Sequence, residues 1–370
     1  MNIDRGWRSA VAAALVLLVA GCSFGDIRRP VPTPPAPPPT SAPAQATPVD
    51  PHEVRRARVP VPSDFDQNYV EFTDIDHGYV LYTRCGTANG VSRAPVSSCT
   101  AIVLATADGG RSWQQLRHPR PVAENHQLYA VDDDLLLLAE PHGWYISADH
   151  GRTFRHESRS SEVPAAYRSL FGRFQVEEGS GQVVEWVDDR ARPVPTQPPV
   201  PGLSSVAYVG GRLFAAGMEG GRLYAAFSLD KGRTWHQTLV PTRDDEVFML
   251  RVMPSSNGLD LWLVGYTGLI SFPYLWRLDG YRWEPVAAAG HPERIGGLAA
   301  IGDGMLAVTG PSGSGVVVDG RYDKVGWPLG SDHLRTLDDG TLFSVHPDGV
   351  IWFGIGYAAG RRWIKVVLHR

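Results

Sequence analysis

The octapeptide TADGGRSW, at Thr106–Trp113, recurs along the chain and decides the fold. The two other copies are SADHGRTF at Ser147–Phe154 and SLDKGRTW at Ser228–Trp235. All three fit the pattern [ST]-x-D-x-G-R-[ST]-[WF], and their aspartates are separated by 41 and 81 residues. A period of about 41 residues indicates a repeat architecture, in which one supersecondary unit recurs along the chain.

Each residue type in the octapeptide suits a tight turn between two antiparallel strands. The hydroxyl and the carboxylate can accept hydrogen bonds from backbone amides in the turn, and glycine supplies a positive φ. The final aromatic residue can leave the turn and pack between neighbouring sheets. We therefore expect a structural and not a catalytic role for Thr106, Asp108, Gly110, Ser112, Trp113, Ser147, Asp149, Gly151, Thr153, Phe154, Ser228, Asp230, Gly232, Thr234 and Trp235.

Weaker copies of the repeat continue to the C-terminus. They end at Trp283, Trp327 and Trp363, and a degenerate copy lies near VEWVDDRARPVP. Between them lie short runs rich in Val, Leu, Tyr and Phe, such as LLLLAE and VIWFGIG, with turn residues every eight to twelve positions. This spacing indicates an all-β protein. Dividing residues 64–370 by the period predicts a β-propeller of seven four-stranded blades, with six or eight blades as alternatives.

The octapeptides resemble the Asp-box, or BNR repeat, of sialidase-type β-propellers. VEFTDIDHGYVL, at Val70–Leu81, followed by ATADGGRSWQQL, also resembles the first blade of the photosystem II assembly-factor branch of these propellers. That resemblance implies seven blades and a non-enzymatic role. Its specific residues cover only the boxes, and nothing in the sequence implies a photosynthetic host.

The N-terminal segment predicts export and lipidation. Ala10–Ala20 is an apolar run of eleven residues, which is shorter than the ~20 residues needed to cross a bilayer and fits a secretory signal. The following VAGC, at Val19–Cys22, resembles a bacterial lipobox, which implies cleavage before Cys22 and attachment of acyl chains such as palmitate to it. An ordinary signal peptide with a buried free thiol is the alternative. We expect a lipid-anchored protein on the extracytoplasmic side of a cell membrane.

A proline-rich linker is predicted to follow the signal. Pro30–Pro62 contains twelve prolines and few large apolar residues, so it cannot bury a core and should be disordered or polyproline II. The predicted organisation is a signal peptide at 1–21, a lipidated cysteine and linker at 22–63, and a propeller at 64–370. Export also favours a disulfide between Cys85 and Cys99, which flank a turn-rich loop; two separate thiols are the alternative.

Loops of one propeller face are the expected place for a ligand. The net charge of −4 and the lack of a basic run argue against a nucleic-acid partner. Connections between second and third strands, and between blades, share one face, where propellers usually bind ligands. No HxH or HExxH spacing supports a metal, and we expect no cofactor. The candidates on this face are His118, Arg120, His126, His142, Phe272, Tyr274, His291, Arg294, His333 and His346.

The residues of sialidase catalysis are poorly matched. Those enzymes carry a Tyr/Phe-Arg-Ile-Pro stretch and three arginines that bind the substrate carboxylate. Here ARVP, at Ala57–Pro60, lacks the aromatic residue, and Arg111, Arg152 and Arg233 lie in the octapeptides. The sequence therefore favours a non-catalytic binding or assembly scaffold for a protein or a cell-envelope glycan. An exo-acting glycoside hydrolase of the sialidase type is the alternative.

Overall fold

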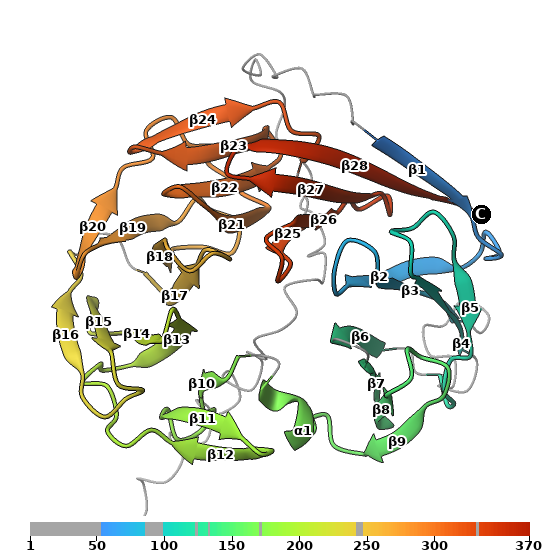
Figure 1. The fold of residues 1–370 in the computed structure, drawn as a ribbon, viewed down its shortest axis with the longest axis horizontal. Helices are drawn as coiled ribbons and strands as arrows, with labels where there is room; N and C mark the ends of the chain where they lie inside the picture. The colour runs from blue at the N-terminus through green and yellow to red at the C-terminus, as the bar shows by residue number, and fades with distance from the viewer. Residues whose placement is uncertain are drawn as a thin grey trace, which may run out of the picture. The chain divides into compact units, whose positions relative to one another are not determined.

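The computed structural model describes residues 53–85, 99–122, 125–131, 134–169, 172–241, 247–330 and 333–370. The predicted signal peptide, Cys22 and the linker up to residue 52 lie outside these ranges. No helix in the described part of the chain has the length and apolar character needed to cross a membrane. The described residues form seven β-sheets, arranged as blades of a ring (Figure 1).

The first four blades follow the chain from its N-terminal side. Blade 1 contains β2 (Asp66–Phe72), β3 (Gly78–Cys85), β4 (Cys99–Thr106) and β5 (Gln114–Leu116). Blade 2 contains β6 (Asn125–Val131), β7 (Asp134–Glu140), β8 (Gly143–Ser147) and β9 (Arg155–Ser158). A short helix, α1 (Ala165–Arg168), precedes blade 3, which contains β10 (Phe174–Val176), β11 (Val183–Val187) and β12 (Arg190–Pro193). Blade 4 contains β13 (Leu203–Val209), β14 (Arg212–Glu219), β15 (Arg222–Ser228) and β16 (His236–Leu239).

The last three blades complete the ring. Blade 5 contains β17 (Met249–Pro254), β18 (Leu261–Tyr266), β19 (Tyr274–Asp279) and β20 (Arg282–Val286). Blade 6 contains β21 (Gly297–Gly302), β22 (Met305–Gly310), β23 (Gly313–Val318) and β24 (Arg321–Val325). Blade 7 contains β25 (His333–Thr336), β26 (Leu342–Val345), β27 (Ile351–Tyr357) and β28 (Gly360–His369), and β1 (Glu53–Arg58) joins it as a fifth strand.

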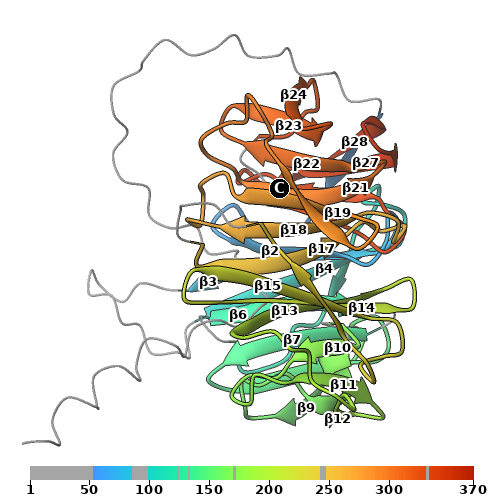
Figure 2. The same cartoon turned by 90° about the vertical axis from the view of Figure 1, so that its left-hand side faces the viewer.

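The predicted seven-bladed propeller is confirmed. Within each blade, strands that follow one another in the chain pair in an antiparallel manner. Connections in such a sheet alternate between its two ends, so the blades present two faces. We call the face with the octapeptides the turn face, and the opposite one the loop face. Figure 2 shows the ring from its side, with strands running between these faces.

The three octapeptides form the same hydrogen-bonded turn between third and fourth strands. In blade 1, the Gly110 amide donates to Thr106 Oγ1 over 2.9 Å, and the Ser112 amide donates to Asp108 Oδ1 over 2.9 Å. The equivalent bonds in blades 2 and 4 measure 2.7 to 2.9 Å. Such bonds favour the carboxylate, so the pKa of Asp149 falls to about 2 through Ser147 and Thr153.

The glycine of each octapeptide serves packing as well as conformation. Gly110 has a φ of 85°, and a Cβ there would lie 2.6 Å from Val366 of blade 7. Gly151 approaches Leu116 of blade 1 in the same way. Each turn therefore rests on the preceding blade. The aromatic residue does likewise, since the Trp235 indole donates to the Thr196 carbonyl over 2.7 Å.

Strand β1 closes the ring. It pairs in parallel with β28, from Glu53 opposite Ile364 to Arg58 opposite His369, so the two ends of the propeller lie side by side (Figure 1). The linker predicted from the sequence includes this segment, because Pro30–Pro62 is rich in proline and contains few large apolar residues. The predicted boundary at Asp64 is therefore corrected to Glu53.

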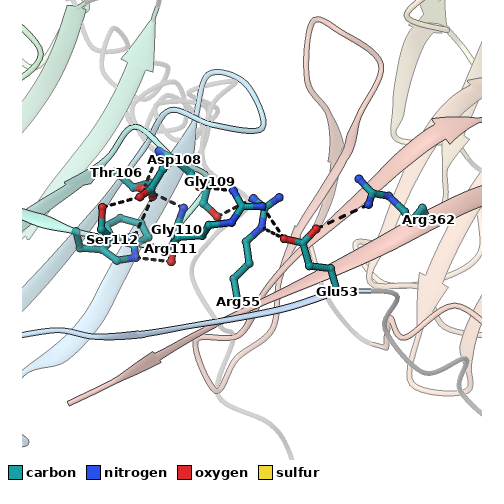
Figure 3. A network of polar contacts seen from close by, with 10 residues as sticks. Glu53, Arg55, Thr106, Asp108, Gly109, Gly110, Arg111, Ser112 and Arg362 are labelled. Atoms are coloured by element: carbon teal, nitrogen blue, oxygen red, sulfur yellow. Dashed lines mark hydrogen bonds and ion pairs between the residues drawn. The ribbon is translucent and has the colours of Figure 1, made fainter.

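A polar network fastens β1 to blade 1 (Figure 3). The buried Arg55 donates to the Gly109 carbonyl over 2.9 Å and to Glu53 Oε1 over 2.7 Å. Arg111 of the first octapeptide reaches the same Glu53 oxygen at 2.7 Å, and Arg362 of β28 lies 3.8 Å from the other oxygen. The hydrogen bond from Arg55 is the main cause that lowers the pKa of Glu53. One carboxylate thus joins three segments that are far apart in sequence.

Candidate functional site

The loop face carries the connections in which the sequence placed its candidates. The disulfide between Cys85 and Cys99 is confirmed, and it joins the end of β3 to the start of β4 with a Cα–Cα distance of 4.1 Å. These are the second and third strands of blade 1, so the connection lies on the loop face. Residues 86–98 lie outside the described residues. The corresponding connection of blade 5, residues 267–273, is described in full.

Two connections of blade 5 form a small ladder on the loop face. The Phe272 amide donates to the Glu293 carbonyl over 3.1 Å, and the Ile295 amide donates to the Ile270 carbonyl over 2.8 Å. The rings of Phe272 and His291 stack, with their centroids 4.1 Å apart and their planes 17° apart. The structure thus brings together three candidates from two loops, which are Phe272, His291 and the exposed Arg294.

Large apolar side chains are exposed beside this ladder. Leu269 is 70% exposed, Ile270 48% and Phe248 46%. The Phe248 amide donates to the Tyr266 carbonyl over 2.9 Å, which holds Phe248 next to the end of β18 where the 267–273 connection begins. We call Phe248, Leu269, Ile270, Phe272, His291 and Arg294 the blade 5 rim. Contiguous exposed apolar groups on a soluble domain often mark an interaction site.

Sequence reasoning missed three members of the rim. Leu269 and Ile270 lie in the stretch TGLISFPY, at Thr267–Tyr274, of which the sequence singles out only the aromatic residues Phe272 and Tyr274 as candidates. Phe248 directly precedes β17 and reads as part of that strand. The available signal was an adjacent Leu-Ile pair between glycine and serine, where a loop residue would ordinarily be polar.

Of the four candidates around blade 2, two histidines are buried, whereas His142 is half-buried and Arg120 is exposed. His118 and His126 are 8% and 3% exposed, and their ring centroids are 6.1 Å apart. The Arg120 carbonyl accepts the Tyr145 hydroxyl over 3.1 Å, and the His142 carbonyl accepts His156 Nε2 over 2.9 Å. The structure therefore does not gather these four candidates on one open surface. Among the described residues, no group of three or more His, Cys, Asp or Glu side chains is arranged to hold a metal ion.

The other candidates are dispersed. Tyr274 begins β19 and packs against Trp276, with ring centroids 6.2 Å apart. His333 begins β25 and is exposed. His346 forms an ion pair of 2.7 Å with Asp348 in the turn between β26 and β27. These side chains belong to blades 5 and 7. Within the described connections, the blade 5 rim is the part of the loop face where several candidates meet.

Burial of His118 predicts a pH-dependent stability. Burial lowers the pKa of His118 from 6.5 to about 4. The unfolded chain therefore binds more protons than the folded chain between these values, and stability falls as the pH drops from 6.5 toward 4, by up to about 1.4 kcal/mol per pH unit. Urea denaturation at several pH values in this range gives the free energy of unfolding, which should depend less steeply on pH in His118→Gln than in the unchanged chain.

An equal pH dependence in the two proteins would contradict the prediction. The control is His236→Gln at an exposed histidine, which should leave the pH dependence of the free energy of unfolding unchanged.

In sialidases, three arginines bind the carboxylate of the substrate. Three arginines of this chain also surround a carboxylate, but it is the side chain of the chain's own Glu53. Arg55, Arg111 and Arg362 surround it beside the first octapeptide, and the loop face is at the other end of the blades. On the inner strands, Arg335 of β25 pairs with the buried Glu71 of β2 at 2.8 Å. These arginines therefore join parts of the ring.

The similarity of this chain to the solved structures named below is weak, with TM-scores under 0.5. YCF48 from Cyanidioschyzon merolae is 15% identical with a TM-score of 0.45, over 79% of this chain and 96% of that one. A structure of YCF48 bound to D1 peptide is 13% identical with a TM-score of 0.33, over 83% and 84%. The GH74 xyloglucanase from Xanthomonas campestris is 17% identical with a TM-score of 0.29, over 79% and 45%. No protein-family model and no curated protein matches the chain. The propeller assignment rests on the seven sheets themselves.

Proposed function

We propose that this chain is a non-catalytic binding protein, which holds a protein partner at the blade 5 rim. The observation that carries the proposal is the exposure of Phe248, Leu269 and Ile270 beside Arg294 on one face. Aromatic and aliphatic anchors next to an arginine are typical of the centre of protein interfaces, where burial of a few such groups supplies most of the affinity. A glycan would be expected to meet more polar groups.

The proposed location is the extracytoplasmic side of a cell membrane. The apolar run Ala10–Ala20 and the VAGC sequence support export and acylation of Cys22. The disulfide of blade 1 is consistent with an oxidising compartment. An anchor of this kind would leave the propeller free to present its loop face to a partner in the envelope.

Charged residues at the rim should abolish capture of the partner. The variant Phe248→Glu/Ile270→Glu places two carboxylates where apolar groups would be buried, so binding should weaken by at least about tenfold. The measurement is capture of envelope proteins by the full chain, followed by titration of the captured species. The matched control is Leu259→Glu, because Leu259 is 81% exposed on the turn face.

The outcomes of this experiment separate the candidate functions. Capture that survives both carboxylates, or that Leu259→Glu removes, would exclude the rim. Capture that resists protease treatment of the extract and fails after glycan digestion would replace the protein partner by a glycan. Hydrolysis of a fluorogenic glycoside by the same chain would favour the glycoside hydrolase.

A further inference from the structure

Blade 3 is the irregular member of the ring. In the part of the chain that the structure describes, it has three strands, in the order β10-β11-β12, where each other blade has at least four. Residues 159–169 precede it and contain α1. We call this segment the wedge. The turn between β11 and β12 contains Asp188 and Asp189, both with positive φ, in place of an octapeptide turn.

Blade 3 also differs from most other blades in how it packs against the blade that precedes it. Most neighbouring blades share a hydrophobic core to which strands of both contribute, as blades 4 and 5 do through Phe214 and Leu250. Among the described residues, the core beside blade 2 draws on that blade and on the wedge, and no residue of β10–β12 takes part in it. The described residues of blade 3 face blade 4 instead, where Phe174 and Val183 pack with Leu213.

The wedge is fastened to blade 2 by an apolar anchor. Tyr167 of α1 is 9% exposed and packs with Leu136 and Trp144 of blade 2. The Trp144 indole also donates to the Ser161 carbonyl over 3.2 Å. Burying one aromatic side chain contributes about 1.5–3 kcal/mol. The wedge therefore belongs energetically to blade 2.

The wedge is fastened to blade 3 by polar contacts. The Arg168 guanidinium lies over the Trp186 ring, 5.2 Å from its centroid. The Gln175 side-chain amide donates to the Arg168 carbonyl and, over 2.8 Å, to the Gly172 carbonyl. An open cleft of about 630 Å³ separates the two parts, lined on one side by Ser160 and on the other by Arg190. A cation–π contact at a partly exposed site is worth only about 0.5–1 kcal/mol.

We infer that the propeller has one built-in opening seam, between the wedge and blade 3. Arg168 acts as the strap across this seam. Local opening follows the contacts that cost least to break, and this surface combines polar contacts with an open cleft. When the seam opens, the wedge stays packed on blade 2. The side of blade 3 that faces the wedge and carries Trp186 then becomes accessible to solvent. This inference does not depend on the blade 5 rim.

Hydrogen exchange of the native full chain, followed by mass spectrometry, tests the seam. Arg168→Ala should accelerate exchange in β10–β12 by about two- to fivefold, the factor that corresponds to losing one cation–π contact. Trp186→Leu should give the same local acceleration, and the double variant should add little to either single change, because both remove one contact. Arg190→Ala is the matched control, since Arg190 lines the cleft and forms no hydrogen bond, ion pair or cation–π contact with the described residues of the wedge.

Each other outcome overturns the inference. Exchange that is unchanged in Arg168→Ala and in Trp186→Leu would show that the strap does not hold the seam. Faster exchange in α1 and β6–β9 would mean that the wedge separates from blade 2 instead. Acceleration spread evenly over all blades would indicate global destabilisation without a seam.

Discussion

Trp276→Ala is expected to lower the free energy of unfolding by about 3–5 kcal/mol. Trp276 lies in β19, is 1% exposed and belongs to the core shared by blades 4 and 5. Its indole donates to the Pro241 carbonyl over 3.0 Å, and its ring fills the space left by Gly265. Alanine would leave a cavity between two blades and an unsatisfied carbonyl. The measurement is urea denaturation followed by circular dichroism.

Two further variants make the Trp276 result interpretable. Trp276→Phe keeps most of the apolar volume and should cost clearly less than alanine. Glu284→Ala changes an exposed residue of the neighbouring strand β20 and should stay within about 0.5 kcal/mol. A cost below about 1 kcal/mol for alanine would mean that the shared core between blades does not hold the ring together.

Arg55→Ala is expected to cost about 2–3 kcal/mol, because it removes a buried charge-assisted hydrogen bond. Arg55 is 7% exposed on β1 and bonds to the Gly109 carbonyl and to Glu53. Its loss leaves the Gly109 carbonyl without this donor and weakens the hold of β1 on blade 1. The free energy of unfolding, again from urea denaturation, measures the effect.

The adjacent Arg56 provides the matched control. It lies on the same strand and is exposed, so Arg56→Ala should change stability by less than about 0.5 kcal/mol. Equal effects of the two variants would show that the pairing of β1 with β28 closes the ring without help from the network around Glu53. No effect of either would mean that β1 contributes little to stability.

Much of the fold could be predicted because it depends on turns whose hydrogen-bonding residues are adjacent in the sequence. The octapeptides carry their own hydrogen-bonding groups, such as Thr106 and Asp108, and these act within the turn itself. Their spacing along the chain sets the number of blades. The connection between Cys85 and Cys99 could be placed for the same reason, since its position within a repeat assigns it to one end of a blade.

The candidate site could be predicted only in part. Phe272, His291 and Arg294 were assigned to the loop face by their position in the repeat, and that face is where they meet. His118 lies in an equivalent connection and His126 lies in β6, but both are buried, and their ring centroids are 6.1 Å apart. Position within a repeat tells which end of a blade a residue occupies, and does not tell how deeply it is buried.

The sequence by itself determined the all-β architecture, the blade number, the disulfide and the face that each connection occupies, since all of these follow from local turn chemistry and a fixed period. Only the tertiary structure decided that Glu53–Arg58 closes the ring, that Phe248 and Ile270 are exposed together, and that blade 3 meets a wedge. These features depend on contacts between segments far apart in the chain. The free energy of such contacts comes from burial and pairing in three dimensions, which no local pattern encodes.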